Sequence, residues 1–123
     1  MSNDNYMLSV RLMTYMHVSF IKDAMDGIMS QKTDFKVEVV VGDDFSTDGT
    51  LEIIRTYTDT DHIHIKILER EKVDAYWQKR QKVGRIYNFI NILENCTGKY
   101  IALLDGDDYW TDPLKLQKQV DFL

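Results

Sequence analysis

Residues 100–108 read YIALLDGDD, in which five apolar residues run directly into an acidic turn. A short continuous apolar run is typical of a buried strand in a parallel sheet. The turn at residues 105–108 carries three carboxylates, which repel one another, and a divalent cation with oxygen ligands relieves such repulsion. We therefore expect a buried strand that ends at a metal site. From spacing alone, an ordinary Asp/Gly turn at the surface is an equally good interpretation.

Strand-like and helix-like segments alternate along the rest of the chain. Apolar and β-branched residues predict strands at residues 8–12, 35–41 and 63–67, the last with one less buried face, as at a sheet edge. Apolar residues three and four apart predict helices within residues 18–29, 51–57, 86–93 and 116–123. Residues 69–84 form a polar stretch without an assigned element. The alternation predicts an α/β fold with a mostly parallel sheet of about four strands, flanked by helices.

Polar side chains are expected to cap two of these helices. Ser46, Thr47 and Asp48 are N-cap candidates for the second helix. Asp112 and Pro113 form an N-cap and first-turn pair for the last helix, which is therefore expected to begin at Pro113.

The charge and the cysteine content narrow the possible functions. The chain is 44% hydrophobic and 28% charged, as in ordinary folded proteins. Its net charge of −5 argues against a nucleic-acid-binding protein, and an anionic ligand would need the local help of a cation. Cys96 is the only cysteine, so neither an internal disulfide nor a cysteine-based metal site is expected, which fits a reducing compartment.

The ends of the sequence give two further expectations. No apolar run approaches the roughly 18 residues of a membrane span, and the first six residues do not resemble a signal peptide. We therefore expect a cytoplasmic protein. The chain ends at Leu123 inside a predicted helix that has no glycine cap, so residues 1–123 are expected to be one domain truncated at its C-terminus.

Polar residues follow three of the predicted strands. Open α/β sheets bind their ligands at the carboxyl ends of their strands, so these residues are candidates for a binding site. Thr14 and Tyr15 follow the first strand, Asp43 and Asp44 follow the second, and the turn at 105–108 follows the fourth. One carboxylate of the second pair could accept hydrogen bonds from a base or ribose; alternatively, both serve the N-terminus of the next helix. A calcium loop of the EF-hand type is excluded, because its twelfth position is Arg55 rather than glutamate.

Basic side chains gather before the third predicted helix. The four cations are Lys79, Arg80, Lys82 and Arg85. They could neutralise a diphosphate, although a solvated loop is the more common meaning of such a run. The three histidines, His17, His62 and His64, lack metal-like grouping and are expected to be structural or surface residues.

Four stretches of this sequence together resemble the family 2 glycosyltransferases with the GT-A fold. They are residues 9–15 with 31–33, residues 39–50 (VVVGDDFSTDGT), Asn88-Phe89, and residues 98–110 (GKYIALLDGDDYW). The second and fourth stretches are specific in combination, because an Asp-Asp-x-Ser-x-Asp-Gly turn is followed some 60 residues later by a strand-borne Asp-x-Asp.

The resemblance implies a fold and an activity. The fold would be the Rossmann-like nucleotide-binding half of a GT-A domain, with strand order 3-2-1-4. The activity would be transfer of a sugar from a nucleoside diphosphate sugar, with a UDP-sugar as the expected donor, to an acceptor hydroxyl with inversion. The acceptor would be a glycan or a lipid-linked molecule of the cell-envelope polysaccharide type, and the full-length protein would associate peripherally with the cytoplasmic face of the membrane.

The resemblance also implies roles for individual residues. Thr14 and Tyr15 match positions that contact the nucleoside, and Asp44 matches the carboxylate that reads the base. Asp105 would approach the ribose or the metal, and Asp107 would bind the Mn²⁺ or Mg²⁺ that bridges the diphosphate. Lys82 and Arg85 are added as phosphate contacts on charge and position alone. The general base of this family comes from a later part of the sequence, so we expect it beyond Leu123.

Two departures and three alternatives accompany this hypothesis. Met13 stands where many members of the family have proline or cysteine, and Met16 stands where many have asparagine. The loop after the first strand is therefore expected to differ in shape. A phosphoacceptor receiver domain would place its acidic pair after the first strand, and a nucleotidyltransferase would have a glycine-rich basic loop there. A non-catalytic nucleotide-sugar-binding fragment would differ only in the sequence after Leu123.

Overall fold

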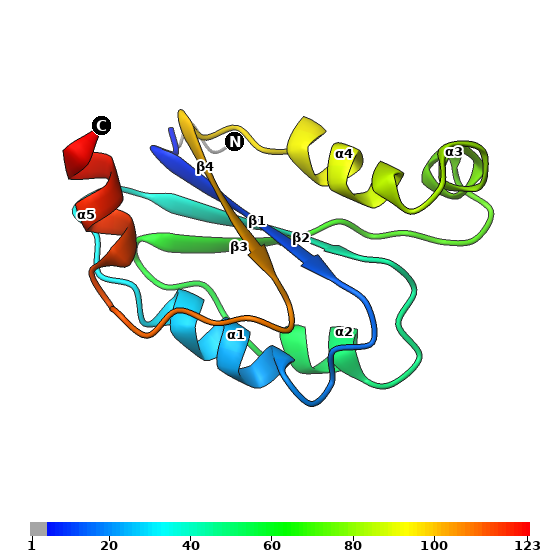
Figure 1. Ribbon diagram of the computed structural model, residues 1–123, viewed down its shortest axis with the longest axis horizontal. Helices are drawn as coiled ribbons and strands as arrows, with labels where there is room; N and C mark the ends of the chain where they lie inside the picture. Colours follow the sequence, from blue (N-terminus) through cyan, green and yellow to red (C-terminus); the bar gives the residue numbers. More distant parts are fainter. Residues whose placement is uncertain (1–4) are drawn as a thin grey trace.

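Figure 1 shows the computed structural model of the protein, which describes residues 5–123. Strands and helices alternate along most of the chain. In order, they are β1 (Leu8–Thr14), α1 (Ile21–Met29), β2 (Val37–Asp43), α2 (Thr50–Ile54), β3 (Ile63–Ile67), α3 (Ala75–Val83), α4 (Ile86–Glu94), β4 (Tyr100–Asp105) and α5 (Lys115–Phe122). Within residues 5–123, none of the helices has the length and apolar character needed to cross a bilayer.

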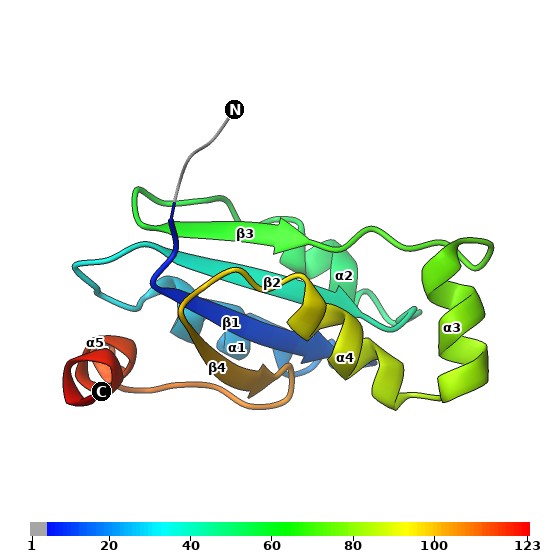
Figure 2. The same cartoon turned by 90° about the horizontal axis from the view of Figure 1, so that it is seen from above.

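The four strands form one parallel sheet with the order β3-β2-β1-β4, which confirms the predicted fold class and strand order. Figure 2 shows β1 and β2 in the middle and β3 at one side, where the alternating pattern of its sequence places it. The chain passes outward from β1 to β3 and then returns to pair β4 with the other side of β1. Strand order therefore reverses at β1, which is where such sheets bind ligands.

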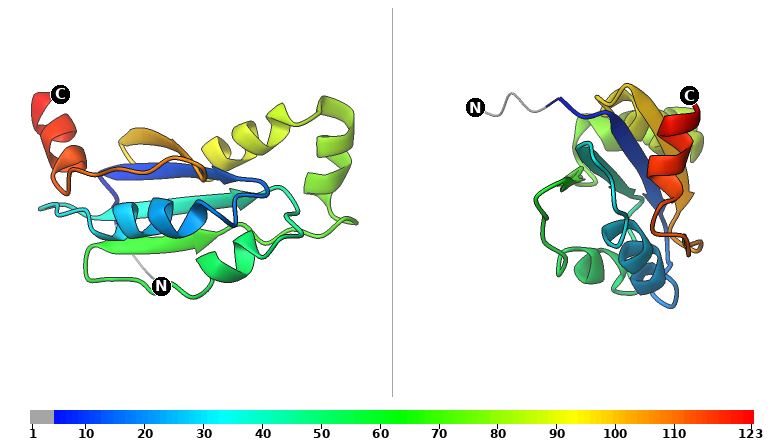
Figure 3. Two further views of the ribbon diagram at one scale, coloured as in Figure 1. Left: turned by 60° about the horizontal axis from the view of Figure 1, so that its bottom comes forward. Right: turned by 90° about the vertical axis from the view of Figure 1, so that its left-hand side faces the viewer.

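One face of the sheet carries the hydrophobic core. α1 and α2 cover this face, as Figure 3 shows. Alternate residues of the central strands point into the core, namely Val10 and Leu12 of β1 and Val39 and Val41 of β2. Buried residues of two helices pack against them: Ile21, Met25 and Ile28 of α1, and Leu116 of α5. The β-branched residues of β2 and the three-and-four spacing in α1 therefore form the core that the sequence predicts.

The opposite face carries buried polar groups, and α4 packs on it against β1 and β2. Glu38 is 2% exposed, and its carboxylate accepts hydrogen bonds from the Ser9 hydroxyl (2.5 Å), the Thr97 amide (2.6 Å) and the Thr97 hydroxyl (2.9 Å). Arg11 is also buried on this face. A buried charge is tolerated only with such partners, so this face combines specific polar pairs with apolar packing of Val40 and Ile92.

β4 differs from the continuous buried strand that its apolar sequence predicts. Ala102 and Leu104 are buried, whereas Ile101 is 47% exposed and Leu103 is 55% exposed. The prediction of a fully buried strand is therefore wrong. β4 is an edge strand, and in the described part of the chain no helix covers the face that Ile101 and Leu103 share.

α3 occupies part of the polar stretch at residues 69–84 and was missed by the sequence analysis. Tyr76 is its only buried residue, so the helix lacks the apolar stripe by which helices are recognised. Its ends do carry signals. The Asp74 carboxylate accepts a hydrogen bond from the Trp77 amide at 2.8 Å, and Gly84, with φ of 96°, ends the helix.

The predicted side-chain caps are wrong, because the N-cap residues are Gly49 for α2 and Leu114 for α5, and neither helix has a side-chain cap. α2 begins after Gly49, whose φ is 99°, and the Asp48 carboxylate accepts a hydrogen bond from the Thr50 amide at 3.1 Å. α5 begins at Lys115, two residues later than predicted, because Asp112 forms a turn in which its carboxylate accepts from the Leu114 amide at 2.9 Å. Ser46 and Thr47 do not cap α2.

The one-sided burial of β4 makes a prediction about two neighbouring leucines. Leu104→Ala is expected to lower the free energy of unfolding by about 2–5 kcal/mol, because it leaves a cavity in the core. Leu103→Ala is the matched control and should change it by no more than about 0.5 kcal/mol. Urea denaturation followed by circular dichroism measures both values. Equal losses for the two variants would contradict the described orientation of β4.

Candidate functional site

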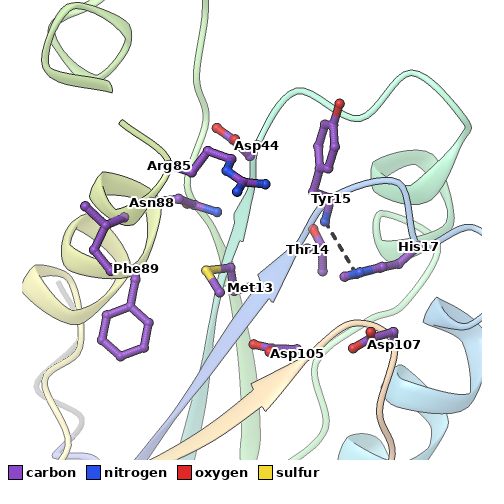
Figure 4. A pocket seen from close by; sticks show the side chains of 11 residues that line it. Met13, Thr14, Tyr15, His17, Asp44, Arg85, Asn88, Phe89, Asp105 and Asp107 are labelled. Atoms are coloured by element: carbon purple, nitrogen blue, oxygen red, sulfur yellow. Dashed lines mark hydrogen bonds between the residues drawn. The ribbon is translucent and has the colours of Figure 1, made fainter. Parts of the chain in front are cut away.

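A cavity of about 380 Å³ lies at the carboxyl ends of the central strands. It opens where β1 and β4 end and α4 begins (Figure 4). Its lining residues are Met13, Thr14, Tyr15, His17, Asp44, Arg85, Ile86, Asn88, Phe89, Asp105 and Asp107. This is the position expected from the reversal of strand order, and it collects polar groups from parts of the sequence that are far apart.

Asp43 joins the loops that follow β1 and β2. Its buried carboxylate accepts hydrogen bonds from the Thr14 hydroxyl (2.7 Å), the Ser46 amide (2.9 Å) and the Ser46 hydroxyl (2.6 Å). The Ser46 hydroxyl oxygen in turn accepts from the Met16 amide at 2.9 Å. Asp43 therefore has a structural role, and only its neighbour Asp44 lines the cavity.

A second set of bonds between the same loops surrounds Asp48. Its carboxylate accepts from the Val18 amide (3.1 Å) and from the Thr50 hydroxyl (2.6 Å), and that hydroxyl oxygen accepts from the His17 amide (2.9 Å). The hydrogen bond from Thr50 is the main cause that lowers the pKa of Asp48, with the backbone bonds adding to it. The loop after β1 is thus fixed on the start of α2.

The acidic turn after β4 packs closely under the loop after β1. The Gly106 amide donates to the Met13 carbonyl at 2.9 Å, and the Asp108 amide donates to the Asp105 carbonyl at 3.0 Å. A Cβ atom on Gly106 would lie 2.6 Å from Nδ1 of His17 and 2.8 Å from Cγ2 of Thr14. Only glycine fits here without a shift, and this close approach brings Asp105 and Asp107 to the cavity.

Asp105 and Asp107 differ in their partners. Oδ1 of Asp105 lies 2.7 Å from Nη1 of Arg11, in an ion pair in which the side chain of Arg11 is 5% exposed and that of Asp105 is 50% exposed. The carboxylate of Asp107 forms no hydrogen bond or ion pair with any residue in the described range 5–123. Figure 4 shows both aspartates on the same side of the cavity. Asp107 is therefore the carboxylate that is available to a cation.

The metal-binding capacity of this turn is limited. No cluster of three or more His, Cys, Asp or Glu side chains with the geometry of a metal site occurs among residues 5–123. One or two carboxylates fit a hard cation such as Mg²⁺ or Mn²⁺ only if phosphate oxygens and water complete its ligands. The donor set at Asp107 is of that kind.

Asp44 is held by residues of α3. Its carboxylate faces Arg80, with Nε 3.1 Å from Oδ1 and Nη2 3.0 Å from Oδ2, and it accepts a hydrogen bond from the Tyr76 hydroxyl at 3.1 Å. The hydrogen bond to Asp44 is the main cause that raises the pKa of Arg80. Burial raises the pKa of Tyr76, which therefore stays a neutral donor at physiological pH.

The structure brings most of the predicted site residues together. Thr14, Tyr15, Asp44, Arg85, Asp105 and Asp107 all line the cavity. Lys82 is exposed on α3 and is not among the lining residues. The Thr14 hydroxyl is bonded to Asp43, whereas the Tyr15 side chain is 55% exposed beside the cavity and its amide lies 3.4 Å from Nδ1 of His17 (Figure 4).

Three arginines contact residues of the site, namely Arg11, Arg70 and Arg80, and the sequence did not assign these contacts to them. Arg80 was one of four cations in a polar stretch, and no sequence signal separates it from its neighbours because the helix that orients it was missed. Arg11 carried a signal: it is a charged residue in the middle of a strand that belongs to a parallel sheet, whose two faces are normally covered. Such a residue is expected to have a charged partner.

Comparison with known proteins gives a consistent family. The family model described as glycosyl transferase family 2 matches residues 9–123. The uncharacterized protein Rv1520 of Mycobacterium tuberculosis is 39% identical over 116 residues, which are 94% of this chain and 31% of that protein. The putative teichuronic acid biosynthesis glycosyltransferase TuaG of Bacillus subtilis is 32% identical over 124 residues, which cover 100% of this chain and 44% of that protein.

Two solved structures share the fold of this chain. The mannosyltransferase PcManGT from Pyrobaculum calidifontis, in complex with GDP-Man and Mn²⁺, matches 98% of this chain with a TM-score of 0.74 and 26% identity, over 33% of its own length. Residues 1–349 of S. aureus TarS, in complex with UDP-GlcNAc, match 94% of this chain with a TM-score of 0.66 and 28% identity, over 30% of that chain. The chain thus spans about a third to under half of the length of these matched chains.

Asp43 has three hydrogen-bond donors around its carboxylate whereas Asp107 has none among residues 5–123, and this difference predicts unequal effects on stability. Asp43→Ala is expected to lower the free energy of unfolding by about 2–4 kcal/mol, because it leaves buried donors of Thr14 and Ser46 without acceptors. Asp107→Ala removes an exposed carboxylate without partners and should change stability by less than about 0.5 kcal/mol. Thermal and urea denaturation measure both. A loss of similar size in the two variants would show that Asp43 does not join the loops.

Proposed function

The chain belongs to glycosyl transferase family 2, and from this membership we propose that it is the part of a metal-dependent, inverting glycosyltransferase that binds the nucleoside diphosphate sugar. The observation that carries the proposal is the cavity in which Asp44, Asp105 and Asp107 meet at the carboxyl ends of β1, β2 and β4. The complexes of TarS with UDP-GlcNAc and of PcManGT with GDP-Man and Mn²⁺ support a ligand of this class.

The proposal assigns the diphosphate to the Asp107 side of the cavity. Departure of a nucleoside diphosphate builds negative charge on the leaving group, and a divalent cation stabilises that charge as a Lewis acid. Asp107 would hold this Mn²⁺ or Mg²⁺, because its carboxylate has no partner in residues 5–123. Arg85 lines the cavity and would add a positive contact to the phosphates. Lys82 stays a weaker phosphate candidate, because it does not line the cavity.

The nucleoside would lie between Asp44 and the loop after β1. Asp44 presents carboxylate oxygens that can accept a hydrogen bond from an N–H group of the base, and uracil has such a group. Tyr15 offers an exposed ring beside the cavity, on which a base or ribose can pack. Asp105 lies two residues from Asp107 and would accept a hydrogen bond from a ribose hydroxyl. A UDP-sugar is accordingly the proposed donor.

The acceptor side of the reaction belongs to the full-length protein. The proposal places the general base that deprotonates the acceptor hydroxyl outside this chain, since Asp105 and Asp107 are assigned to the leaving group. The proposed acceptor is a glycan or a lipid-linked molecule in cell-envelope polysaccharide synthesis, a context that the name of TuaG supports. We also propose that the protein acts in the cytoplasm, at the membrane face where a lipid-linked acceptor would be presented.

The metal assignment predicts the behaviour of Asp107→Ala. The variant is expected to lose the Mn²⁺-dependent part of its affinity for UDP, about tenfold or more, because the bridge between protein and diphosphate is removed. Isothermal titration calorimetry with UDP, in the presence of Mn²⁺ and of EDTA, measures this difference. The wild-type affinity should fall to the level of the variant when EDTA is added. An unchanged affinity of Asp107→Ala in Mn²⁺ would refute the assignment.

If Asp44 accepts a hydrogen bond from the uracil base, removing either the carboxylate or the N3–H group should weaken UDP binding equally. Asp44→Ala is expected to weaken UDP binding by about 1.5–3 kcal/mol, the usual contribution of a hydrogen bond to a charged group. UDP methylated at N3 of uracil should bind the wild type as weakly as UDP binds the variant, and the variant should not distinguish the two ligands. Calorimetry with both nucleotides, and with GDP as a third, tests the assignment. A variant that still prefers unmethylated UDP would contradict it.

A further inference from the structure

Arg11 is a buried cation beside the proposed donor site. It lies in the middle of β1, between Val40 of β2 and Leu103 of β4, and is 4% exposed. Its guanidinium lies 4.8 Å from the ring centre of Phe89, which lines the cavity. A charged group in this position is costly without compensation, so its partner is expected to matter.

That partner is Asp105. Nη1 of Arg11 donates to Oδ1 of Asp105 at 2.7 Å, and this is the one ion pair of Arg11 within residues 5–123. Nε of Arg11 is buried and has no hydrogen-bond partner in the same range. The guanidinium is therefore compensated by a single carboxylate. One oxygen of Asp105 is engaged, while half of its side chain stays exposed toward the cavity.

The two aspartates of the turn therefore differ in charge compensation: Arg11 neutralises Asp105 but not Asp107. Asp107 lies two residues from Asp105 and has no partner among the described residues, so it carries an uncompensated negative charge. A cation held by Asp105 would share that carboxylate with the Arg11 guanidinium and would be repelled by its positive charge. A cation on Asp107 alone would have one protein ligand, which is too few for tight binding unless phosphate oxygens add theirs.

We propose that Arg11 is a positioning residue that keeps the divalent cation off Asp105, so that the cation binds tightly only together with the diphosphate. This inference rests on the proposed function. Arg11 holds one oxygen of Asp105 and leaves the other for the nucleoside part of the ligand. The two negatively charged phosphate groups of the diphosphate then supply the oxygen ligands that the protein alone does not provide. The cation and the nucleotide therefore bind together.

The test is a titration of Mn²⁺ without nucleotide, in which electron paramagnetic resonance measures the free ion. The wild type is expected to bind weakly. Arg11→Met removes the charge but keeps an unbranched apolar side chain beside Phe89, and it should bind Mn²⁺ about tenfold more tightly, because Asp105 becomes a ligand. Arg11→Lys keeps the charge and should bind as the wild type does. Unchanged affinity in Arg11→Met, or equal gains in both variants, would overturn the proposal.

A second pair of variants separates this charge effect from a change in folding. The double variant Arg11→Met, Asp105→Asn should return to weak binding, because the added ligand is lost again. Asp105→Asn alone keeps an acceptor for Arg11 and should leave the nucleotide-free Mn²⁺ affinity of the wild type unchanged. A loss of more than about threefold in that single variant would show that Asp105 already binds the cation, and would overturn the proposal even if Arg11→Met does not fold.

The outcome is independent of whether the donor assignment is right. The titration contains no nucleotide, so a gain in Arg11→Met can be observed even if UDP does not bind. Conversely, Mn²⁺-dependent binding of UDP that requires Asp107 would support the proposed function even if Arg11→Met gains nothing. When UDP is present, the Mn²⁺ affinities of wild type and Arg11→Met are expected to converge, because the diphosphate then completes the ligands in both. A difference that persists in full with UDP would contradict the coupling.

Discussion

The carboxylate of Asp43 is the constraint on which the rest of the site depends. It joins the Thr14 hydroxyl at the end of β1 to Ser46 in the loop after β2, and it is buried while doing so. Parallel strands have no turn that links their carboxyl ends directly, so contacts between the loops align them there. The carboxylate of Asp43 adds to the backbone bond that the Asp44 amide donates to the Thr14 carbonyl at 3.0 Å. Because Asp43 takes this role, Asp44 is free to face the cavity.

The two faces of the sheet also differ in role. One face is apolar, and the other holds Glu38 and Arg11 in specific polar pairs under α4. Apolar packing alone would give stability without fixing where the acidic turn lies. The Arg11–Asp105 pair fixes the end of β4 relative to β1, and the contact of Gly106 with His17 and Thr14 limits how far the turn can move. The stable face and the functional face are therefore the two sides of the same strands.

The sequence predicts features that repeat along the chain and misses those that depend on a single distant contact. Periodic apolar residues located all four strands and four of the five described helices, and the polar residues after strands located the cavity. β4 was predicted to be buried on both faces, because five apolar residues look alike whether a neighbouring element covers them or not. α3 was missed because a helix that contacts the protein through Tyr76 and Arg80 has no apolar stripe. The ion pairs of Arg11 and Arg80 join residues 94 and 36 positions apart, and no local pattern specifies such partners.

These two ion pairs explain how a chain with a net charge of −5 can offer a site for an anionic ligand. Three aspartates line the cavity, but Arg80 compensates Asp44 and Arg11 compensates Asp105. Among residues 5–123, Asp107 and Arg85 are the charged cavity residues that lack an ion pair. The local field is therefore much less negative than the count of carboxylates indicates. A diphosphate would meet one free cation and one free carboxylate, and the free carboxylate is useful to it only through a metal ion. In the proposed function, the pairing of the other aspartates would make the binding of the metal and of the anion depend on each other.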